Sequence, residues 1–174
     1  MYEGKLVRLR AFESGDLDAC HAFVNDYETV ASMVKGLPLP SSYDDERQWL
    51  QHQTTYTRGE YQFAIENGDG DLVGRCGPVS VDWKNRLAEL AIMIGTPYRG
   101  RGFGTEAISL LCAFCFDEMN LRRLKISVLA DNTAAIRCYE KNGFVREGLW
   151  REEVYRGGRW QDVILMAKFR PNPA

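Results

Sequence analysis

The stretch "YRGRGFGTEA", residues 98–107, determines which fold can be expected of this 174-residue chain. An alternating, largely apolar segment (86–95) precedes it, and an apolar segment of helical character (105–119) follows it. This order predicts a strand, a tight loop and a helix. The loop combines alternating glycines with two arginines, at Arg99, Gly100, Arg101, Gly102 and Gly104.

Such a loop has the chemistry of an anion site. Glycine lets backbone N–H groups come close to a ligand, and the helix that follows adds unpaired N–H donors and the positive end of its dipole. Arg99 and Arg101 can add charge-assisted hydrogen bonds. We therefore predict that the loop binds a phosphate group, while a plain turn that uses glycine only for its geometry is the alternative.

Two common phosphate motifs do not fit the loop. A Walker A loop requires Gly-Lys-Ser/Thr, whereas Gly104 is followed here by Thr105 and Glu106. A Rossmann fingerprint requires glycine at the position of Thr105 and prefers the first strand of the chain. The sequence therefore favours a phosphate-bearing ligand of another class.

The composition is ordinary for a globular protein, with 45% hydrophobic and 26% charged residues. The length suits one domain. A net charge of -2 argues against nucleic-acid binding, which normally needs a basic excess. The N-terminus has no apolar signal-peptide segment, and the longest apolar run, Ala107–Phe116, is too short to cross a bilayer. We expect a cytoplasmic protein with no membrane contact.

The cysteines are predicted to have structural rather than catalytic or metal-binding roles. There are five, an odd number that suits a reducing compartment. Cys112 and Cys115 form a C-x-x-C inside an apolar helical run, and neither His21 nor His52 is near them in sequence. We predict that this pair packs in the core and binds no metal.

The remaining pattern predicts one α/β domain with a mixed sheet. Val7, Leu9 and Ala11 share one face of the first strand, and Ser14 is expected to cap the first helix. Strands are expected at 5–12, 61–66, 71–77, 86–95, 122–130, 144–156 and 159–169, and helices at 13–26, 43–53, 105–119 and 131–144.

Glycines and capping residues predict where the C-terminal helix and hairpin begin and end. Asp131 or Asn132 can cap the last helix, and Gly143 can supply the left-handed residue that ends it. Gly157 and Gly158 predict a two-residue hairpin turn between the last two strands.

Two blocks of this sequence resemble the signatures of the GNAT-superfamily N-acetyltransferases. "RGRGFG" resembles their pyrophosphate loop, Gln/Arg-x-x-Gly-x-Gly/Ala, which corresponds here to Arg99, Gly102 and Gly104. "NTAAIRCYEKNGF" resembles the second signature through Asn132, Tyr139, Lys141, Gly143 and Phe144.

The resemblance extends over nearly the whole chain. The opening "GKLVRLRAFESGDL" and the ending "YRGGRWQDVILM" are similar to the branch that acetylates the N-termini of ribosomal proteins and related amines. It implies a single GNAT domain over residues 1–174. The implied sheet is mixed and mostly antiparallel, with about seven strands and about four flanking helices.

The resemblance also implies acetyl-CoA as cosubstrate, with its pyrophosphate in the glycine loop. The segments 86–95 and 123–130 would splay apart, and the pantetheine arm would lie between them. The residues expected to bind the donor are Ile92, Met93, Ile94, Arg99, Gly100, Arg101, Gly102, Phe103, Gly104, Thr105, Asn132 and Lys141.

Direct attack of a neutral amine on the thioester needs a base, a stabilised oxyanion and an acid for the leaving thiolate. Tyr139 is the candidate acid, since a phenol is protonated at neutral pH. Glu89 is the candidate base, because it is a lone carboxylate on an otherwise apolar strand. A water chain is the alternative base, and a core tyrosine is the alternative for Tyr139. Backbone N–H groups at Ile92–Ile94 could polarise the carbonyl.

Three further side chains keep two interpretations each. Asn132 can contact pantetheine or simply cap a helix. Lys141 can reach a phosphate or be solvated. Cys138 could act as a nucleophile, but it has no histidine or aspartate nearby in sequence, so we favour a structural role.

The acceptor is expected between the segment 25–43 and the hairpin at 155–160. Asp26, Glu28, Tyr43 and Trp160 there would suit a cationic amine. We expect a primary amine as acceptor, such as the N-terminus of a ribosomal protein, with a polyamine, an antibiotic or an amino-acid analogue as alternatives. A non-catalytic acyl-CoA sensor is the rival from another class, and Tyr139 and Glu89 favour an enzyme. The resemblance further suggests a homodimer.

Overall fold

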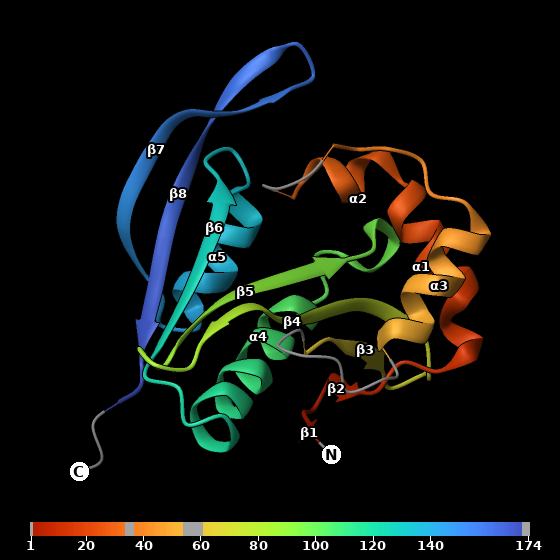
Figure 1. Cartoon of the computed structure of the whole chain (residues 1–174), viewed down its shortest axis with the longest axis horizontal. Coiled ribbons are helices and arrows are strands. Elements are labelled where there is room, and N and C mark those ends of the chain that lie inside the picture. The colour runs from red at the N-terminus through yellow and green to blue at the C-terminus, as the bar shows by residue number, and fades with distance from the viewer. Residues whose placement is uncertain (1, 34–36, 54–60, 172–174) are drawn as a thin grey trace.

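A computed structural model describes residues 2–33, 37–53 and 61–171 of the chain. Its centre is an eight-stranded sheet in the order β1-β2-β3-β4-β5-β6-β8-β7 (Figure 1). Neighbouring strands are antiparallel except β5 and β6, which are parallel. The strands are β1 (Tyr2–Glu3), β2 (Val7–Arg10), β3 (Phe63–Asn67), β4 (Leu72–Asp82), β5 (Leu87–Ile94), β6 (Arg123–Leu129), β7 (Val145–Arg156) and β8 (Arg159–Phe169).

Five α-helices accompany the sheet in the described part of the chain. They are α1 (Leu17–Asn25), α2 (Tyr27–Ala31), α3 (Tyr43–Gln53), α4 (Phe103–Ala113) and α5 (Thr133–Lys141). A π-helical turn, Phe114–Glu118, continues α4, and 3-10 turns lie at Ser14–Asp16 and Thr96–Tyr98. The predicted class, a mixed and mostly antiparallel sheet with flanking helices, is confirmed. The expected counts of about seven strands and four helices miss β1 and α2.

The start of the chain differs in detail from the prediction. The first long strand, β2, ends at Arg10, so Ala11 is exposed and does not share a face with Val7 and Leu9. Ser14 does not cap a helix, because a reciprocal pair of hydrogen bonds between Glu13 and Asp16 opens the 3-10 turn instead. The Arg10 guanidinium holds Asp16 at 2.8 Å, which fixes this turn against the sheet.

The C-terminal elements follow the prediction closely. The Asn132 side chain accepts a 3.1 Å hydrogen bond from the Ala135 N–H and so caps α5. Gly143 follows the helix with a φ of 81°. Gly157 and Gly158 have φ values of 59° and 78°, the left-handed pair that a tight hairpin turn needs.

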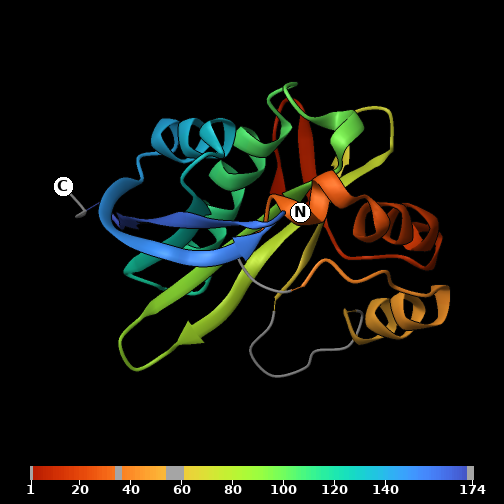
Figure 2. The ribbon, with the colours of Figure 1, turned by 90° about the horizontal axis from the view of Figure 1, so that it is seen from above.

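Helices cover the two faces of the sheet separately (Figure 2). α4 and α5 pack on one face, where Leu111 and Met166 belong to the larger core. α1 and α3 pack on the other face, where Phe23 and Met93 belong to a smaller core.

The C-x-x-C pair lies where α4 passes into the π-helical turn. Cys112 is 2% and Cys115 0% exposed, and both belong to the larger core. The core position predicted for this pair is therefore confirmed.

The feature that positions the site is the divergence of β5 and β6. Their parallel pairing joins only three residue pairs, the last of which is Glu89 with Lys125. Beyond that point β5 stays paired with β4, and β6 stays paired with β8. Figure 1 shows the resulting V, with β6 and β8 rising together while β5 runs toward α2. The predicted splaying of these two strands is thus observed. No helix among the described residues is long and apolar enough to span a membrane.

Candidate active site

A cleft of about 1050 Å³ fills the V between β5 and β6. Its walls come from the diverging strands, the glycine loop with the start of α4, one side of α5, the C-terminal part of α2 and the β7–β8 turn. All the residues predicted to bind the donor line this cleft except Arg101. The two predicted catalytic residues, Tyr139 and Glu89, line it as well.

The glycine loop turns β5 into α4 and leaves the helix start open. Gly100 and Gly102 have φ values of 73° and 87°, a conformation that side chains other than glycine rarely adopt. Gly102 is the N-cap of α4, and no side chain caps this end. A Cβ on Gly104 would make only ordinary contacts, with Ile94 at 3.4 Å and Ile92 at 3.9 Å, so packing against β5 does not by itself require glycine here. The open N–H groups at the start of α4 therefore fit an anion.

The two loop arginines make other contacts than predicted. The Arg99 guanidinium donates to the Ile94 carbonyl at 3.1 Å and, at 3.4 Å, to the Glu28 carbonyl, so it ties the loop to α2. Arg101 is not in the cleft lining, and its guanidinium stacks over the Phe103 ring at 4.9 Å. The anion site is therefore made mainly of backbone N–H groups.

Positive charge reaches the cleft from α5 instead. Arg137 and Lys141 both line it and are exposed. Arg137 was not predicted from the sequence, although it stands four residues before Lys141 and hence on the same side of the helix. The oxygen of Asn132 is used as the α5 cap, so its amide nitrogen is the group left to face a ligand.

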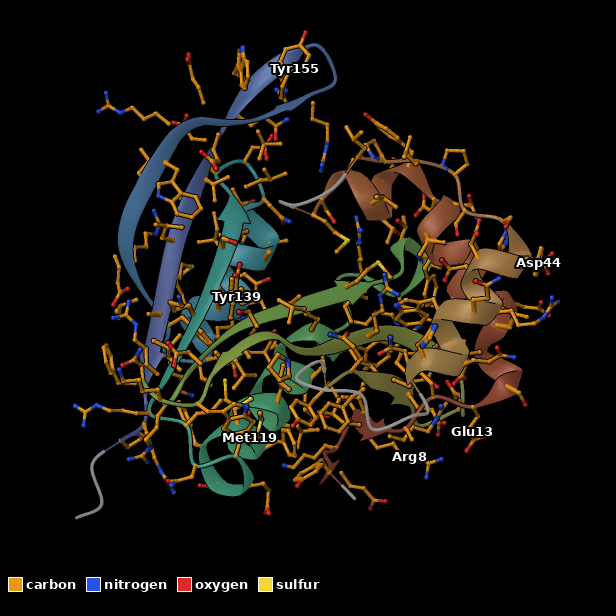
Figure 3. The ribbon with its side chains drawn as sticks, in the orientation of Figure 1. Arg8, Glu13, Asp44, Met119, Tyr139 and Tyr155 are labelled. Carbon is orange, nitrogen blue, oxygen red and sulfur yellow. The ribbon has the colours of Figure 1, made fainter. Side chains whose placement is uncertain are left out.

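Tyr139 is held by α5 at the inner end of the cleft (Figure 3). The residue is 6% exposed, and its ring packs against Phe144. Among the described residues, no hydrogen bond reaches its hydroxyl. Burial, with a smaller contribution from Cys138, raises the pKa of the Tyr139 phenol well above its usual value. The phenol is therefore protonated at neutral pH, as a general acid must be.

The neighbouring thiol has the wrong properties for a nucleophile. Burial raises the pKa of the Cys138 thiol, while a hydrogen bond with Thr105 opposes that shift. A raised pKa lowers the thiolate fraction. The Asn142 amide also donates to the Cys138 carbonyl at 2.9 Å and to the Thr105 carbonyl at 3.0 Å. This corner thus joins α5 to the start of α4.

Glu89 is the last residue of β5 that pairs with β6 before these two strands diverge. The Ser127 hydroxyl on β6 donates to it at 3.3 Å across the opening. Alternation along β5 gives Glu89 the same face as Ala91 and Met93, which is the face covered by α1 and α3. The carboxylate is half-buried and lines the cleft, where it can receive a proton from an amine. Ser127 had no signal of its own in the sequence.

The segments expected around the acceptor do contribute to the walls, but through other residues than expected. The lining takes Tyr27, Ala31, Ser32 and Met33 from the first segment, and Arg156, Gly157 and Arg159 from the hairpin.

The four side chains predicted to face the acceptor, Asp26, Glu28, Tyr43 and Trp160, are not in the lining. Asp26 caps α2 and accepts a hydrogen bond from Thr29. Tyr43 stacks on His21 at 3.8 Å, and Trp160 packs on Tyr155. Asp26, Tyr43 and Trp160 are therefore engaged in local hydrogen bonds and ring contacts instead.

The β7–β8 turn lines the acceptor end of the cleft. Arg156 is 7% exposed, and its guanidinium donates to the Ala31 carbonyl at 2.7 Å, the Val30 carbonyl at 3.4 Å and the Met33 carbonyl. Nearby, the Gln161 side chain lines the cleft, and its oxygen is buried without a partner among the described residues. Neither residue was singled out from the sequence, because only the fold brings the β7–β8 hairpin to α2.

A second cavity of about 200 Å³ adjoins the cleft. Its lining shares Met33, Val79 and the β5 residues 91–93 with that of the cleft. The remaining lining residues are Trp49, Gln53, Gln62 and Arg75. Within residues 2–33, 37–53 and 61–171, no group of three or more His, Cys, Asp or Glu side chains could hold a metal ion.

Comparisons with known proteins agree with this geometry. The family described as "Acetyltransferase (GNAT) domain" matches residues 7–145. The spermidine N(1)-acetyltransferase of Vibrio cholerae is 30% identical over 165 residues, which cover 92% of this chain and 94% of that protein. A crystal structure of spermidine N-acetyltransferase from Vibrio cholerae, in complex with CoA and spermine, superposes with a TM-score of 0.86 at 28% identity, over 95% of this chain and 96% of that one.

Two other relatives have names that give different activities. The putative ribosomal N-acetyltransferase YdaF of Bacillus subtilis is 30% identical over 132 residues, 72% of this chain and 69% of that protein. The L-amino acid N-acetyltransferase AaaT of Escherichia coli is 27% identical over 160 residues, 86% of this chain and 96% of that protein.

Proposed function

Because the chain belongs to the GNAT acetyltransferase family, we propose that it transfers an acetyl group from acetyl-CoA to the primary amine of a small molecule. The chain is an acetyl-CoA-dependent N-acyltransferase, and the acceptor is the part that is proposed. The relatives support the small-molecule alternative better than a ribosomal-protein N-terminus, since the spermidine enzymes match more of the chain.

The observation that carries this proposal is the wall that two segments build at the acceptor end of the cleft. The buried Arg156 pins the β7–β8 turn to the carbonyls at the end of α2, so these segments wall the cleft on that side. A small amine fits such a pocket, whereas a protein N-terminus needs an open groove for the residues that follow it.

The proposed chemistry begins with binding of the donor. The open N–H groups at the start of α4, including Thr105, bind the pyrophosphate, and Asn132 binds the pantetheine arm. Arg137 and Lys141 attract the phosphates.

The proposed transfer itself uses two side chains and the main chain of β5. Main-chain N–H groups at 92–94 polarise the thioester carbonyl. Glu89 accepts the proton of the attacking amine, and Tyr139 gives a proton to the departing thiolate.

This transfer occurs in a ternary complex, because direct attack needs no covalent enzyme intermediate. We further propose that residues 1–174 form one domain. A homodimer and a cytoplasmic location stay predictions.

Thiol release from acetyl-CoA tests the acceptor. Spermidine, free amino acids and hexapeptides with free N-termini should be compared at equal concentrations, with N-acetylated peptides as blanks. We expect a small amine to exceed every peptide in kcat/KM by at least about tenfold. A peptide as the best acceptor would overturn the small-molecule proposal and restore the ribosomal one.

A further inference from the structure

Arg75 stands out because it places a positive charge in the second cavity, beside the site proposed for the amine. It lies on β4 directly opposite Met93 of β5. Opposite residues of antiparallel strands share a face, so Arg75 points to the side covered by α1 and α3, as Ala91 and Glu89 do.

The guanidinium is held in place by stacking on an aromatic ring. Its central carbon lies 4.3 Å from the centre of the Trp49 ring. Among the described residues, no hydrogen bond and no ion pair reaches it. Burial lowers the pKa of the Arg75 guanidinium from its usual value, and the charge of Glu46 opposes that shift. Arginine nevertheless stays protonated at neutral pH.

Glu46 does not pair with this guanidinium. It is 6% exposed, and one of its oxygens accepts a 3.0 Å hydrogen bond from the Ser41 hydroxyl. The other oxygen is buried without a partner in the described part of the chain. The carboxylate therefore acts on Arg75 only through space. The Arg75 side chain lines the cavity, and a guanidinium has the planar set of donors that matches a carboxylate.

The cavity lies beside the reacting atoms of the proposed transfer. Met93, opposite Arg75, is within the main-chain segment 92–94 that would polarise the thioester, and neighbouring strands are about 5 Å apart. The two cavities share the lining of residues 91–93. One small molecule can therefore present its amine to the thioester and another group to Arg75.

We propose that Arg75 selects an acceptor that carries a carboxylate close to its primary amine, so that the substrate is an amino acid or a similar amino carboxylate. This inference rests on the proposed function and narrows its substrate class. The carboxylate would pair with the guanidinium through two parallel hydrogen bonds. A polyamine would instead bring further positive charge to a guanidinium that no described carboxylate contacts, which costs affinity.

Matched acceptor pairs test the proposal in the full-length protein. Free amino acids are compared with their own carboxamides, which keep the amine and side chain but lose the negative charge, and with spermidine. We expect the wild-type protein to prefer the carboxylate member of the best pair in kcat/KM by about 10- to 100-fold, the range of one charge-assisted hydrogen bond.

Substitutions of Arg75 then test whether this residue causes the preference for the acid over the amide. In Arg75→Met the ratio of kcat/KM for the acid over that for the amide should fall toward 1, and Arg75→Lys should recover part of it. Arg47→Met is the matched control, because Arg47 is an exposed arginine of α3 paired with Asp44, and it should keep the wild-type ratio. Calorimetric binding of acetyl-CoA reports whether each variant is folded.

Three results would overturn the proposal. The first is a wild-type preference for amides or spermidine over acids, which needs no variant. The second is an unchanged acid-to-amide ratio in Arg75→Met. The third is an equal loss for both members of a pair, which would make Arg75 structural. In each case turnover of some small amine would leave the proposed function standing, whereas turnover of peptides alone would end both.

Discussion

Replacing Tyr139 by phenylalanine removes one hydroxyl and little else. The ring is 6% exposed and packs on Phe144, and this packing is kept in Tyr139→Phe. No hydrogen bond to the hydroxyl exists among the described residues, so the free energy of unfolding should change by less than about 1 kcal/mol. What is lost is a protonated donor in the cleft, since burial raises the pKa of this phenol.

The kinetic effect should be large and confined to the chemical step. General acid catalysis contributes about 10²- to 10⁴-fold, equivalent to about 3–5 kcal/mol of transition-state stabilisation. We expect kcat and kcat/KM to fall together, because the proton transfer matures only in the transition state. The affinity for acetyl-CoA, measured by calorimetry, should stay within about threefold of the wild-type value.

The assay is single-turnover acetyl transfer at saturating acetyl-CoA, so that product release does not mask chemistry. Tyr155→Phe is the control, since Tyr155 is 61% exposed and lies outside the cleft lining. A Tyr139→Phe protein with near-normal single-turnover rates would show that the thiolate leaves unaided and that Tyr139 is a packing residue.

Three other perturbations have defined outcomes. Gly102→Asp should weaken CoA binding at least about 100-fold, because it places a negative charge and a strained φ of 87° at the open start of α4. The control Gly68→Asp lies in open space within a hairpin and should bind CoA normally. Thermal melts with and without CoA report the difference in binding. Burial raises the pKa of Cys112 to about 11 and that of Cys115 to about 12, so both should react with thiol reagents only at the rate of unfolding, and rapid labelling of the native protein would contradict their placement in the core. Burial alone would raise the pKa of the Asp16 carboxyl, but the Arg10 guanidinium and a backbone N–H lower this pKa below its usual value. The ionised carboxylate therefore stabilises the folded protein fully above about pH 4, and this contribution to the free energy of unfolding is lost as the pH falls through the lowered pKa. Urea unfolding of Asp16→Asn between about pH 2 and 5 should accordingly show a weaker pH dependence than the wild-type protein, and identical slopes would exclude the ion pair as the cause.

The parts of the fold that local chemistry dictates could be predicted from the sequence. Glycines that need left-handed φ values marked the hairpin turn at Gly157 and the end of α5 at Gly143. Alternation marked the long strands. The short elements β1 and α2 were missed, because two and five residues carry too little pattern and are fixed by tertiary contacts. Ser14 was misjudged as a cap because the Arg10–Asp16 ion pair organises that turn instead.

The site, too, has residues that the sequence could predict and residues that it could not. That the loop, Tyr139 and Glu89 line one cleft could be predicted, since each belongs to a motif or stands out on its own strand. Ser127 and Arg75 were not, because each matters only through strand register or through a helix from elsewhere in the chain. Arg101 shows the reverse case: its place in the motif suggested a phosphate contact, but its side chain stacks on the Phe103 ring and is not in the cleft lining.

The most direct test of the account is a crystal structure of this protein with CoA bound. The account predicts pyrophosphate oxygens about 2.7–3.2 Å from backbone nitrogens at the start of α4. It also predicts the pantetheine arm between β5 and β6, with the sulfur within hydrogen-bonding reach of the Tyr139 hydroxyl. CoA bound outside the V, or with its pyrophosphate away from Gly102–Thr105, would contradict the assignment of the cleft.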